Sequence, residues 1–301
     1  MITLADVQAA SKRIDGRIRR TPTVQAGPDL WFKLEYLQHA GSFKTRGMFN
    51  QILAGDPPSA AGIVVASGGN AGLAAAWAAR ELGITAEVFV PVTAPPVKVA
   101  KLGKLGARVV QYGAEYAEAY AASVVRAQET GAKFCHAYDD AAMVAGNGTL
   151  VGEISEITDF DTVLVAVGGG GLIAGVMAAA PDKKVVAVEP VNARALHAAL
   201  EAGQPVDVPV SGPAADSLGA RRTGQIAFDL AVARKIDAVL VTDDAIVEAR
   251  RNLWDEHRIV VEHGTAAAQA ALVSGAYRPE PGERVVVLLC GANTNPVDLA
   301  M

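Results

Sequence analysis

The sequence predicts an α/β fold built from open, mostly parallel sheets flanked by helices, in one large domain or in two lobes. The chain has 301 residues, of which 51% are hydrophobic and 20% charged, so it can bury a large core. Short β-branched apolar runs alternate with alanine-rich stretches of helical length. The apolar runs are continuous, which is typical of strands covered by helices on both faces.

The first half of the chain supplies most of the expected elements. A capping box, in which Thr3 and Asp6 bond each other's backbone, predicts an N-terminal helix. Residues 31–35 are expected to form a strand and residues 48–53 a helix, with Ser42 as its N-cap. Strands and helices then alternate: strand 63–66, helix 71–82, strand 87–90, helix 97–105, strand 108–112 and helix 115–130.

The alternation resumes in the second half of the chain. Strands are expected at residues 162–167, 184–188, 238–241 and 284–289. No segment has the composition of a linker, and no repeat has the spacing of a solenoid. A second lobe would therefore be interleaved with the first in the sequence.

Charge and cysteine content exclude several function classes. The net charge is −5, and the basic residues occur in isolated pairs that we expect at solvated helix ends: Arg19-Arg20, Arg221-Arg222 and Arg250-Arg251. The two cysteines, Cys135 and Cys290, are too few for a disulfide framework and fit a reducing compartment. The longest apolar run, residues 172–181, is too short to span a membrane. We expect a soluble, cytoplasmic protein that binds neither nucleic acid nor a membrane.

The most informative residue is Lys44, in the segment Gly41-Ser42-Phe43-Lys44-Thr45-Arg46-Gly47. The segment precedes the expected helix, so Lys44 would lie at a helix N-terminus. The helix dipole disfavours a cation there, and partial burial acts in the same direction, so the pKa of Lys44 should fall. A neutral amine can form a Schiff base. The alternative is an ordinary solvent-facing lysine.

Four glycines, Gly168, Gly169, Gly170 and Gly171, join the strand 162–167 to a helical stretch. Their backbone amides and the helix N-terminus would make a cradle for a phosphate group. A tight turn alone needs one glycine. The pattern also meets the relaxed dinucleotide fingerprint, with Glu189 about twenty residues further on, so an NAD-dependent oxidoreductase is a second hypothesis.

Two further loops follow strands. The first, Ser67-Gly68-Gly69-Asn70-Ala71, has exposed amides and the Ser67 hydroxyl, which suit a carboxylate, and Asn70 offers a donor and an acceptor. It could also be only the start of a helix. The second contains Cys290, which could be inert core, although the carboxyl ends of parallel strands face the ligand crevice.

Together these motifs resemble the pyridoxal-phosphate enzymes of the tryptophan synthase β-like fold, and within them the serine/threonine dehydratases. The resemblance covers nearly the whole chain, from Arg20-Thr21-Pro22 to Cys290-Gly291, with five motifs in the family's order. It implies two lobes, each with an open and mostly parallel sheet flanked by helices. Residues 1–37 and 139–301 would form a large cofactor-binding domain, and residues 38–138 a small domain that carries the asparagine loop.

The resemblance also implies roles for the motif residues. Lys44 would hold pyridoxal 5'-phosphate as a Schiff base, Phe43 would pack on the pyridine ring, and Asn70 would bond the phenolic oxygen. The four glycines 168–171 would hold the phosphate, and Cys290 would face the pyridine nitrogen. The substrate would be bound by the loop that consists of Ser67, Gly68, Gly69, Asn70 and Ala71.

The implied reaction is the dehydration and deamination of a small L-3-hydroxy amino acid such as threonine or serine, which gives a 2-oxo acid and ammonia. The freed amine of Lys44 would remove the Cα proton. The family resemblance also implies a homodimer. Which hydroxy amino acid is preferred does not follow from the sequence.

Two departures from the family refine this hypothesis. Related serine racemases carry a serine where this chain has Gly68, so we expect little racemase activity. The family's cation site would use Glu189 and Ala193, but its third position is Ala195, so losing one ligand makes a bound metal doubtful.

Alternatives within the same fold are β-replacement enzymes such as cysteine synthase, or a threonine synthase. Arg46 speaks against them, because the synthases typically carry an aspartate near that position. A cofactor carrier without turnover is a further possibility. We expect His39, His136, His197 and His257 to be surface or packing residues, and we assign no role to the pair Glu262-His263.

Overall fold

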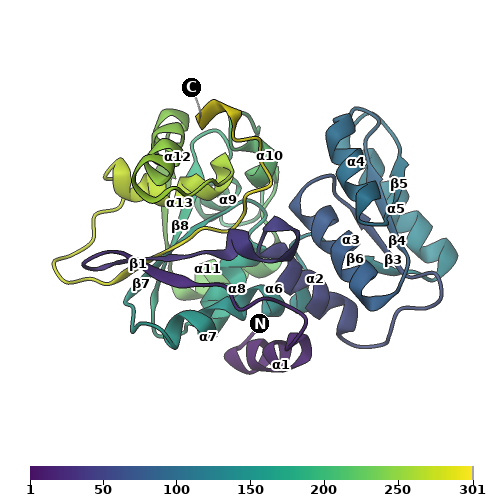
Figure 1. Cartoon of the computed structure of the whole chain (residues 1–301), viewed down its shortest axis with the longest axis horizontal. Coiled ribbons are helices and arrows are strands. Elements are labelled where there is room, and N and C mark those ends of the chain that lie inside the picture. Colours follow the sequence, from purple (N-terminus) through teal and green to yellow (C-terminus); the bar gives the residue numbers. More distant parts are fainter. Residues whose placement is uncertain (300–301) are drawn as a thin grey trace.

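The computed structural model describes residues 1–299 and confirms the predicted α/β fold (Figure 1). Within those residues the strands form two separate sheets. One has six strands in the order β1-β2-β10-β7-β8-β9, with these bounds: β1 (Thr23–Gly27), β2 (Leu30–Lys33), β7 (Thr162–Ala166), β8 (Lys184–Pro190), β9 (Asp237–Val241) and β10 (Val285–Leu288). The other has four in the order β5-β4-β3-β6, with these bounds: β3 (Ile63–Ala66), β4 (Ala86–Val90), β5 (Arg108–Gln111) and β6 (Lys133–Cys135).

Nearly all strand pairs are parallel, as the continuous apolar runs indicated. The exception is β1, which pairs with β2 in antiparallel fashion through Val24 opposite Phe32. Neither β1 nor β6 was predicted, because the sequences TVQAG and KFC are short and lack an apolar run.

Helices cover the sheets. Four accompany the four-stranded sheet: α2 (Lys44–Leu53), α3 (Asn70–Leu82), α4 (Pro96–Lys104) and α5 (Tyr116–Thr130). The others in the described residues are α1 (Leu4–Ile14), α6 (Ala141–Gly148), α7 (Leu150–Ser155), α8 (Gly171–Ala179), α9 (Ala195–Ala202), α10 (Ala215–Leu218), α11 (Gln225–Arg234), α12 (Asp243–His257) and α13 (His263–Val273). Three 3-10 turns complete the set: η1 (Glu35–Leu37), η2 (His39–Gly41) and η3 (Val297–Leu299).

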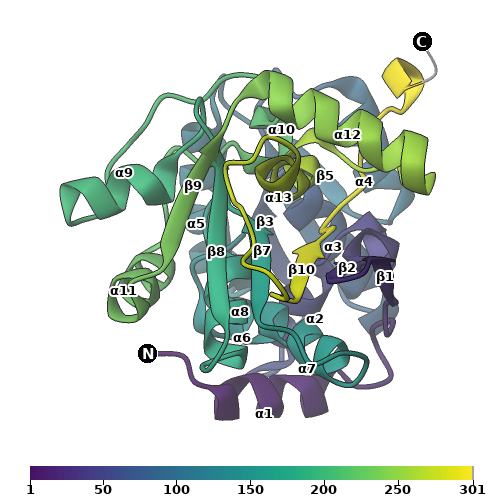
Figure 2. The same ribbon diagram turned by 90° about the vertical axis from the view of Figure 1, so that its left-hand side faces the viewer.

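The six-stranded sheet is buried on both faces (Figure 2). Leu164 of β7 packs into the core that contains α12 and α13, whereas its neighbours Val163 and Val165 pack into the core that contains α8. Successive residues of one strand thus pack into opposite cores, which explains why apolar residues follow one another along β7 after Thr162. Of residues 1–299, no helix is both long and apolar enough to cross a membrane.

The N-terminal capping box is confirmed, but two local predictions were wrong. Ser42 is not the N-cap of α2: the helix begins one residue later, after Phe43, and Ser42 is extended and bridges Gly291. Arg250 is not at a solvated helix end, since it is 1% exposed, donates to the carbonyl oxygen of Val261 at 2.7 Å and pairs with Asp298. In both places contacts with the distant C-terminal segment decide the local structure.

Candidate active site

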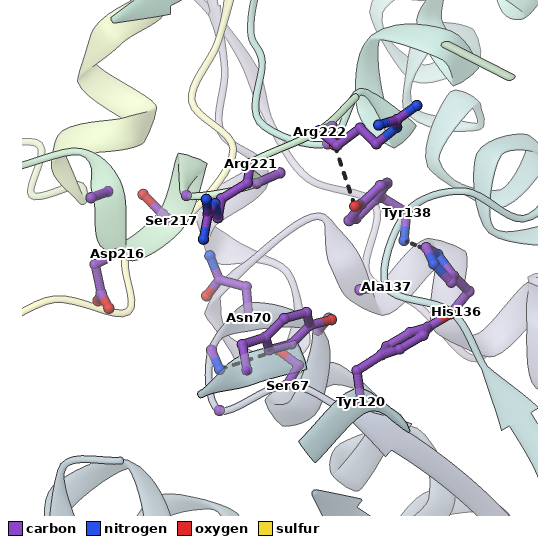
Figure 3. Close-up of a pocket in the computed structure, with 18 of the residues that line it drawn as sticks. Ser67, Asn70, Tyr120, His136, Ala137, Tyr138, Asp216, Ser217, Arg221 and Arg222 are labelled. Carbon is purple, nitrogen blue, oxygen red and sulfur yellow. Dashed lines mark hydrogen bonds between the residues drawn. The ribbon is translucent and has the colours of Figure 1, made fainter. Parts of the chain in front are cut away.

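A cavity of about 780 Å³ lies where the carboxyl ends of strands from both sheets meet (Figure 3). Lys44 lies in it, together with the loop after β3 and Gly169 from the loop after β7. The residues from Ala215 to Arg222 close another side. The predicted lysine, phosphate and carboxylate loops therefore share one cavity, of the size usual for small-molecule sites.

Lys44 is the first residue of α2. Its Nζ donates a hydrogen bond of 2.5 Å to the carbonyl oxygen of Ala137 and lies 5.1 Å from the centre of the Phe43 ring. Burial lowers the pKa of Lys44 from 10.5 to about 8. The pKa of Lys44 is thus lowered as the sequence predicted, and about a tenth of the amine is neutral at pH 7.

The segment before Lys44 is fixed to the loop after β10. The backbone N–H of Phe43 donates to the carbonyl oxygen of Cys290 at 3.0 Å, and Ser42 bridges Gly291. Two loops separated by most of the chain are therefore held in register by backbone contacts.

Cys290 is buried beside Thr265 of α13, which the sequence analysis did not single out. Its Sγ lies 3.2 Å from the Thr265 hydroxyl, which also donates to the carbonyl oxygen of Gly291 at 2.9 Å. Burial raises the pKa of Cys290 to about 12, so the thiol is neutral at physiological pH. A neutral thiol suits contact with an uncharged aromatic nitrogen.

The glycine loop is closely packed against its surroundings. A Cβ on Gly169 would lie 2.4 Å from the Tyr138 ring, and one on Gly171 would lie 2.6 Å from the Tyr138 carbonyl oxygen. Gly170 has a φ of +89° and precedes α8, so a side chain would also be strained there. The loop therefore requires glycines, and it leads into the N-terminus of α8.

A buried hydroxyl beside this loop indicates whether a phosphate would fit against the glycines. Thr223 is 3% exposed, and its Oγ1 has no hydrogen-bond partner within residues 1–299. That oxygen lies 3.2 Å from where a Cβ on Gly170 would be. A buried hydroxyl without a partner is costly, and a phosphate oxygen in the glycine cradle would supply the missing acceptor. The residues thus fit a phosphate ester.

Asn70 is the first residue of α3 and is bonded through both ends of its amide. Its Nδ2 donates to Oε1 of Glu262 at 2.8 Å, and its Oδ1 accepts from Nδ2 of Asn293 at 2.7 Å. Glu262 is buried, which raises its pKa to about 7. Asn70 therefore links the loop after β3 to residues far along the chain. Sequence analysis missed Glu262 and Asn293 because neither belongs to a pattern.

The loop before Asn70 faces the cavity with backbone rather than side chains. The Ser67 hydroxyl accepts from the backbone N–H of Gly69 at 3.2 Å, and Gly68 lies between them. A Cβ on Gly68 would lie 3.3 Å from Cγ1 of Val90, so a small side chain fits with a slight shift. All five residues of the predicted substrate loop line the cavity: Ser67, Gly68, Gly69, Asn70 and Ala71.

Glu189 does not belong to this cavity. Its two carboxylate oxygens accept from the backbone N–H groups of Leu196 and His197, at 2.8 and 2.7 Å, and so cap the start of α9. The ribose contact that an NAD site requires of Glu189 is therefore not offered. The backbone N–H of Ala193 bonds Pro190, and within residues 1–299 no cluster of three His, Cys, Asp or Glu side chains is placed to hold a metal.

His136 lines the cavity and packs against the rings of Tyr120, Phe134 and Tyr138. Its Nδ1 accepts from the backbone N–H groups of Tyr138 and Asp139, at 3.2 and 2.8 Å. These bonds and burial favour the neutral ring, and burial lowers the pKa of His136. His136 directly follows β6, and because that strand was not predicted, the place of His136 in the cavity was not predicted either.

Comparison with known proteins identifies the family of this chain. The family described as "Pyridoxal-phosphate dependent enzyme" matches residues 14–291. A phenylserine dehydratase from Ralstonia pickettii is 38% identical over 99% of this chain and 96% of that protein. An L-threonine ammonia-lyase from Geobacter sulfurreducens is 35% identical over 97% of this chain and 76% of that protein. The solved structure of maize serine racemase superposes with a TM-score of 0.92 at 28% identity, over 99% of this chain and 96% of that one.

Proposed function

The chain belongs to the pyridoxal-phosphate dependent enzymes, and we propose that it is an ammonia-lyase that dehydrates and deaminates an L-3-hydroxy amino acid, for which threonine and serine are the simplest candidates. The products would be a 2-oxo acid and ammonia. The observation that carries the proposal is the lowered pKa of Lys44 in the same cavity as the glycine loop. When bound, pyridoxal phosphate supplies an electron sink for the carbon next to the substrate amine.

Residues of the cavity and residues packed beside it would hold the cofactor at several points. Lys44 would bind its aldehyde as a Schiff base, and the Phe43 side chain would pack on its ring. Gly168, Gly169, Gly170 and Gly171 would hold its phosphate, and the Thr223 hydroxyl, which has no partner within residues 1–299, supports that placement. The neutral thiol of Cys290 would face the pyridine nitrogen. Asn70 keeps a second amide hydrogen for the phenolic oxygen while the first bonds Glu262.

The substrate would lie between Lys44 and the loop Ser67–Ala71. The N-terminus of α3 and the backbone of that loop would bind its carboxylate, since a helix N-terminus favours an anion. Lys44, with a pKa of about 8, would take the Cα proton as a general base. Gly68 offers no side-chain acid to return a proton on the other face, which supports elimination over racemisation.

The arrangement of the chain supports three further proposals. Residues 38–138 would form the small domain and residues 1–37 and 139–301 the large one, since the four-stranded sheet uses only strands between residues 63 and 135. The enzyme would act as a homodimer, as the family resemblance suggests. The free, buried thiols of Cys135 and Cys290 suit a reducing compartment such as the cytoplasm.

The proposal is tested by incubating the purified holoenzyme with L-threonine or L-serine and measuring 2-oxobutanoate or pyruvate together with ammonia. The Lys44→Ala variant is the control and should form neither product above background. If L-serine and L-threonine give no 2-oxo acid, but O-acetylserine and sulfide give cysteine, the enzyme is a β-replacement enzyme and the lyase assignment is wrong.

A further inference from the structure

We propose that the cavity selects a 3-hydroxy amino acid with an aromatic ring on Cβ, and that Tyr116, Tyr120, His136 and Tyr138 form the surface on which that ring packs. We call these four residues the aromatic wall. The inference rests on the proposed lyase function and adds the class of substrate. The simplest member of that class is phenylserine.

The aromatic wall is continuous along one side of the cavity. The ring centres of Tyr116 and Tyr120 are 6.1 Å apart, those of Tyr120 and His136 6.0 Å, and those of His136 and Tyr138 4.9 Å. All four residues line the cavity, and Figure 3 shows Tyr120, His136 and Tyr138 grouped around Ala137. Two of these three pairs are edge-to-face, and a further ring beside them would make contacts of the same kind.

The wall lies next to the reacting atoms. The Lys44 amine bonds the carbonyl oxygen of Ala137, which lies between His136 and Tyr138 in the chain. With the substrate Cα near that amine and its carboxylate on the Ser67–Ala71 loop, the Cβ substituent would extend toward the wall, which lines the same cavity. A phenyl ring there would give the wall an aromatic partner that the side chain of serine lacks.

The wall is also held in place and uncharged. Tyr116 donates to the carbonyl oxygen of Ala66 at 3.2 Å, and Tyr138 donates to that of Arg222 at 3.4 Å. His136 is kept neutral by the two backbone N–H groups that its Nδ1 accepts. In Figure 3 the Arg221 side chain points toward Asn70 rather than toward the wall. The wall therefore favours an apolar ring over a second carboxylate.

The proposed reaction balances. The Cα–H and Cβ–O bonds of phenylserine break, and the 3-hydroxyl leaves as water. The enamine that forms takes up one water and loses ammonia. Phenylserine is thus converted to phenylpyruvate and ammonia without an oxidant or a reductant.

The test compares the holoenzyme with Tyr120→Leu, which keeps an apolar side chain but removes the ring. Tyr112→Leu is the matched control, because Tyr112 is a 55% exposed tyrosine that does not line the cavity. We expect kcat/KM to be higher for phenylserine than for threonine. Tyr120→Leu should lower that ratio about tenfold, as expected for the loss of aromatic contacts, while Tyr112→Leu leaves it unchanged.

A binding measurement separates this inference from the proposed function. L-Phenylalanine and L-alanine lack the 3-hydroxyl and cannot undergo elimination, so calorimetry reports their affinity alone. We expect phenylalanine to bind about tenfold more tightly than alanine, and Tyr120→Leu to abolish the difference.

Three outcomes would overturn the inference. The first is a higher kcat/KM for threonine or serine than for phenylserine, and the second is a higher kcat/KM for 3-hydroxyaspartate than for phenylserine. The third is an equal effect of Tyr120→Leu and Tyr112→Leu on the ratio of kcat/KM values. If no hydroxy amino acid is turned over but phenylalanine still binds more tightly through Tyr120, the lyase function is refuted while the ring-binding surface is supported.

Discussion

The backbone N–H of Phe43 donates a hydrogen bond of 3.0 Å to the carbonyl oxygen of Cys290. This bond holds the residue before Lys44 against a residue of the loop that follows β10. The backbone segments that carry Lys44 and Cys290 are therefore fixed relative to one another without the use of either side chain.

Replacing Thr223 with valine should weaken cofactor binding. Its hydroxyl is buried without a partner among the described residues 1–299, so it would donate to the cofactor phosphate, and a hydrogen bond to a charged acceptor contributes about 1.5–3 kcal/mol. We expect the apparent Kd for pyridoxal phosphate, from titration of the apoprotein by absorbance, to rise about ten- to a hundredfold. Thr223→Ser should restore affinity, and an unchanged Kd in Thr223→Val would remove Thr223 from the site.

Gly68→Ser should create racemase activity. The serine would place a hydroxyl opposite Lys44, where it can return a proton to Cα, and a Cβ fits there with a slight shift of Val90. D-Serine formed from L-serine, followed by chiral chromatography, should increase at least about a hundredfold, the low end for a general acid. Gly68→Ala adds the same Cβ without a hydroxyl and should not gain activity. Fast D-serine production by the unmodified enzyme would refute the assigned role of Gly68.

Arg46→Ala should destabilise the protein strongly. The Arg46 side chain is fully buried and bonds Glu35 at 2.6 Å and Glu153 at 2.7 Å. Its removal leaves the buried Glu35 carboxylate without the cation that it bonds, whereas Glu153 keeps its ion pair with Lys33. We expect the free energy of unfolding in urea to fall by about 3–5 kcal/mol.

Arg80→Ala is the matched control for Arg46. Arg80 forms an exposed ion pair with Glu81, so its loss should change the free energy of unfolding by about 0–1 kcal/mol. Equal effects of the two substitutions would mean that the buried network contributes no more than a surface pair.

Glu262→Gln should change how stability depends on pH. Burial raises the pKa of Glu262 from 4.5 to about 7, so the folded protein keeps a proton that the unfolded chain releases in this interval. The Glu262 contribution to the free energy of unfolding therefore falls as pH rises from 4.5 to 7, by about 3 kcal/mol.

The comparison of wild type with Glu262→Gln isolates this contribution, because the histidines titrate in both proteins. Urea denaturation at a series of pH values should give a difference in unfolding free energy that changes between pH 4.5 and 7 and is constant above. Parallel curves across that interval would show that Glu262 titrates normally.

Sequence patterns predicted the strands and loops that form the site, because each of them is a recognisable run of residue types. The buried strands β7 and β8 appear as apolar runs, and the glycine, serine-glycine and cysteine loops follow their strands directly. Parallel strands bring the glycine and cysteine loops to one edge of the six-stranded sheet, so the meeting of those two loops follows from topology. The serine-glycine loop belongs to the four-stranded sheet, and its approach to the other two depends on how the two sheets pack.

The remaining site residues could not be predicted because their roles depend on single contacts across the chain. Thr223 acquires its role from packing beside Gly170, and Glu262 from a hydrogen bond to Asn70, 192 residues away. Ser42 has the composition of an N-cap, but its pairing with Gly291 places it outside the helix. Isolated polar residues carry no periodic signal that would reveal such partners.

The most direct test of the account is to reduce the purified holoenzyme with borohydride and map the modified peptide by mass spectrometry. The account predicts that the absorbance of the bound cofactor is lost and that Lys44 alone carries the phosphopyridoxyl group, while Lys44→Ala shows no label. Labelling of a different lysine, or none, would contradict the assignment of Lys44.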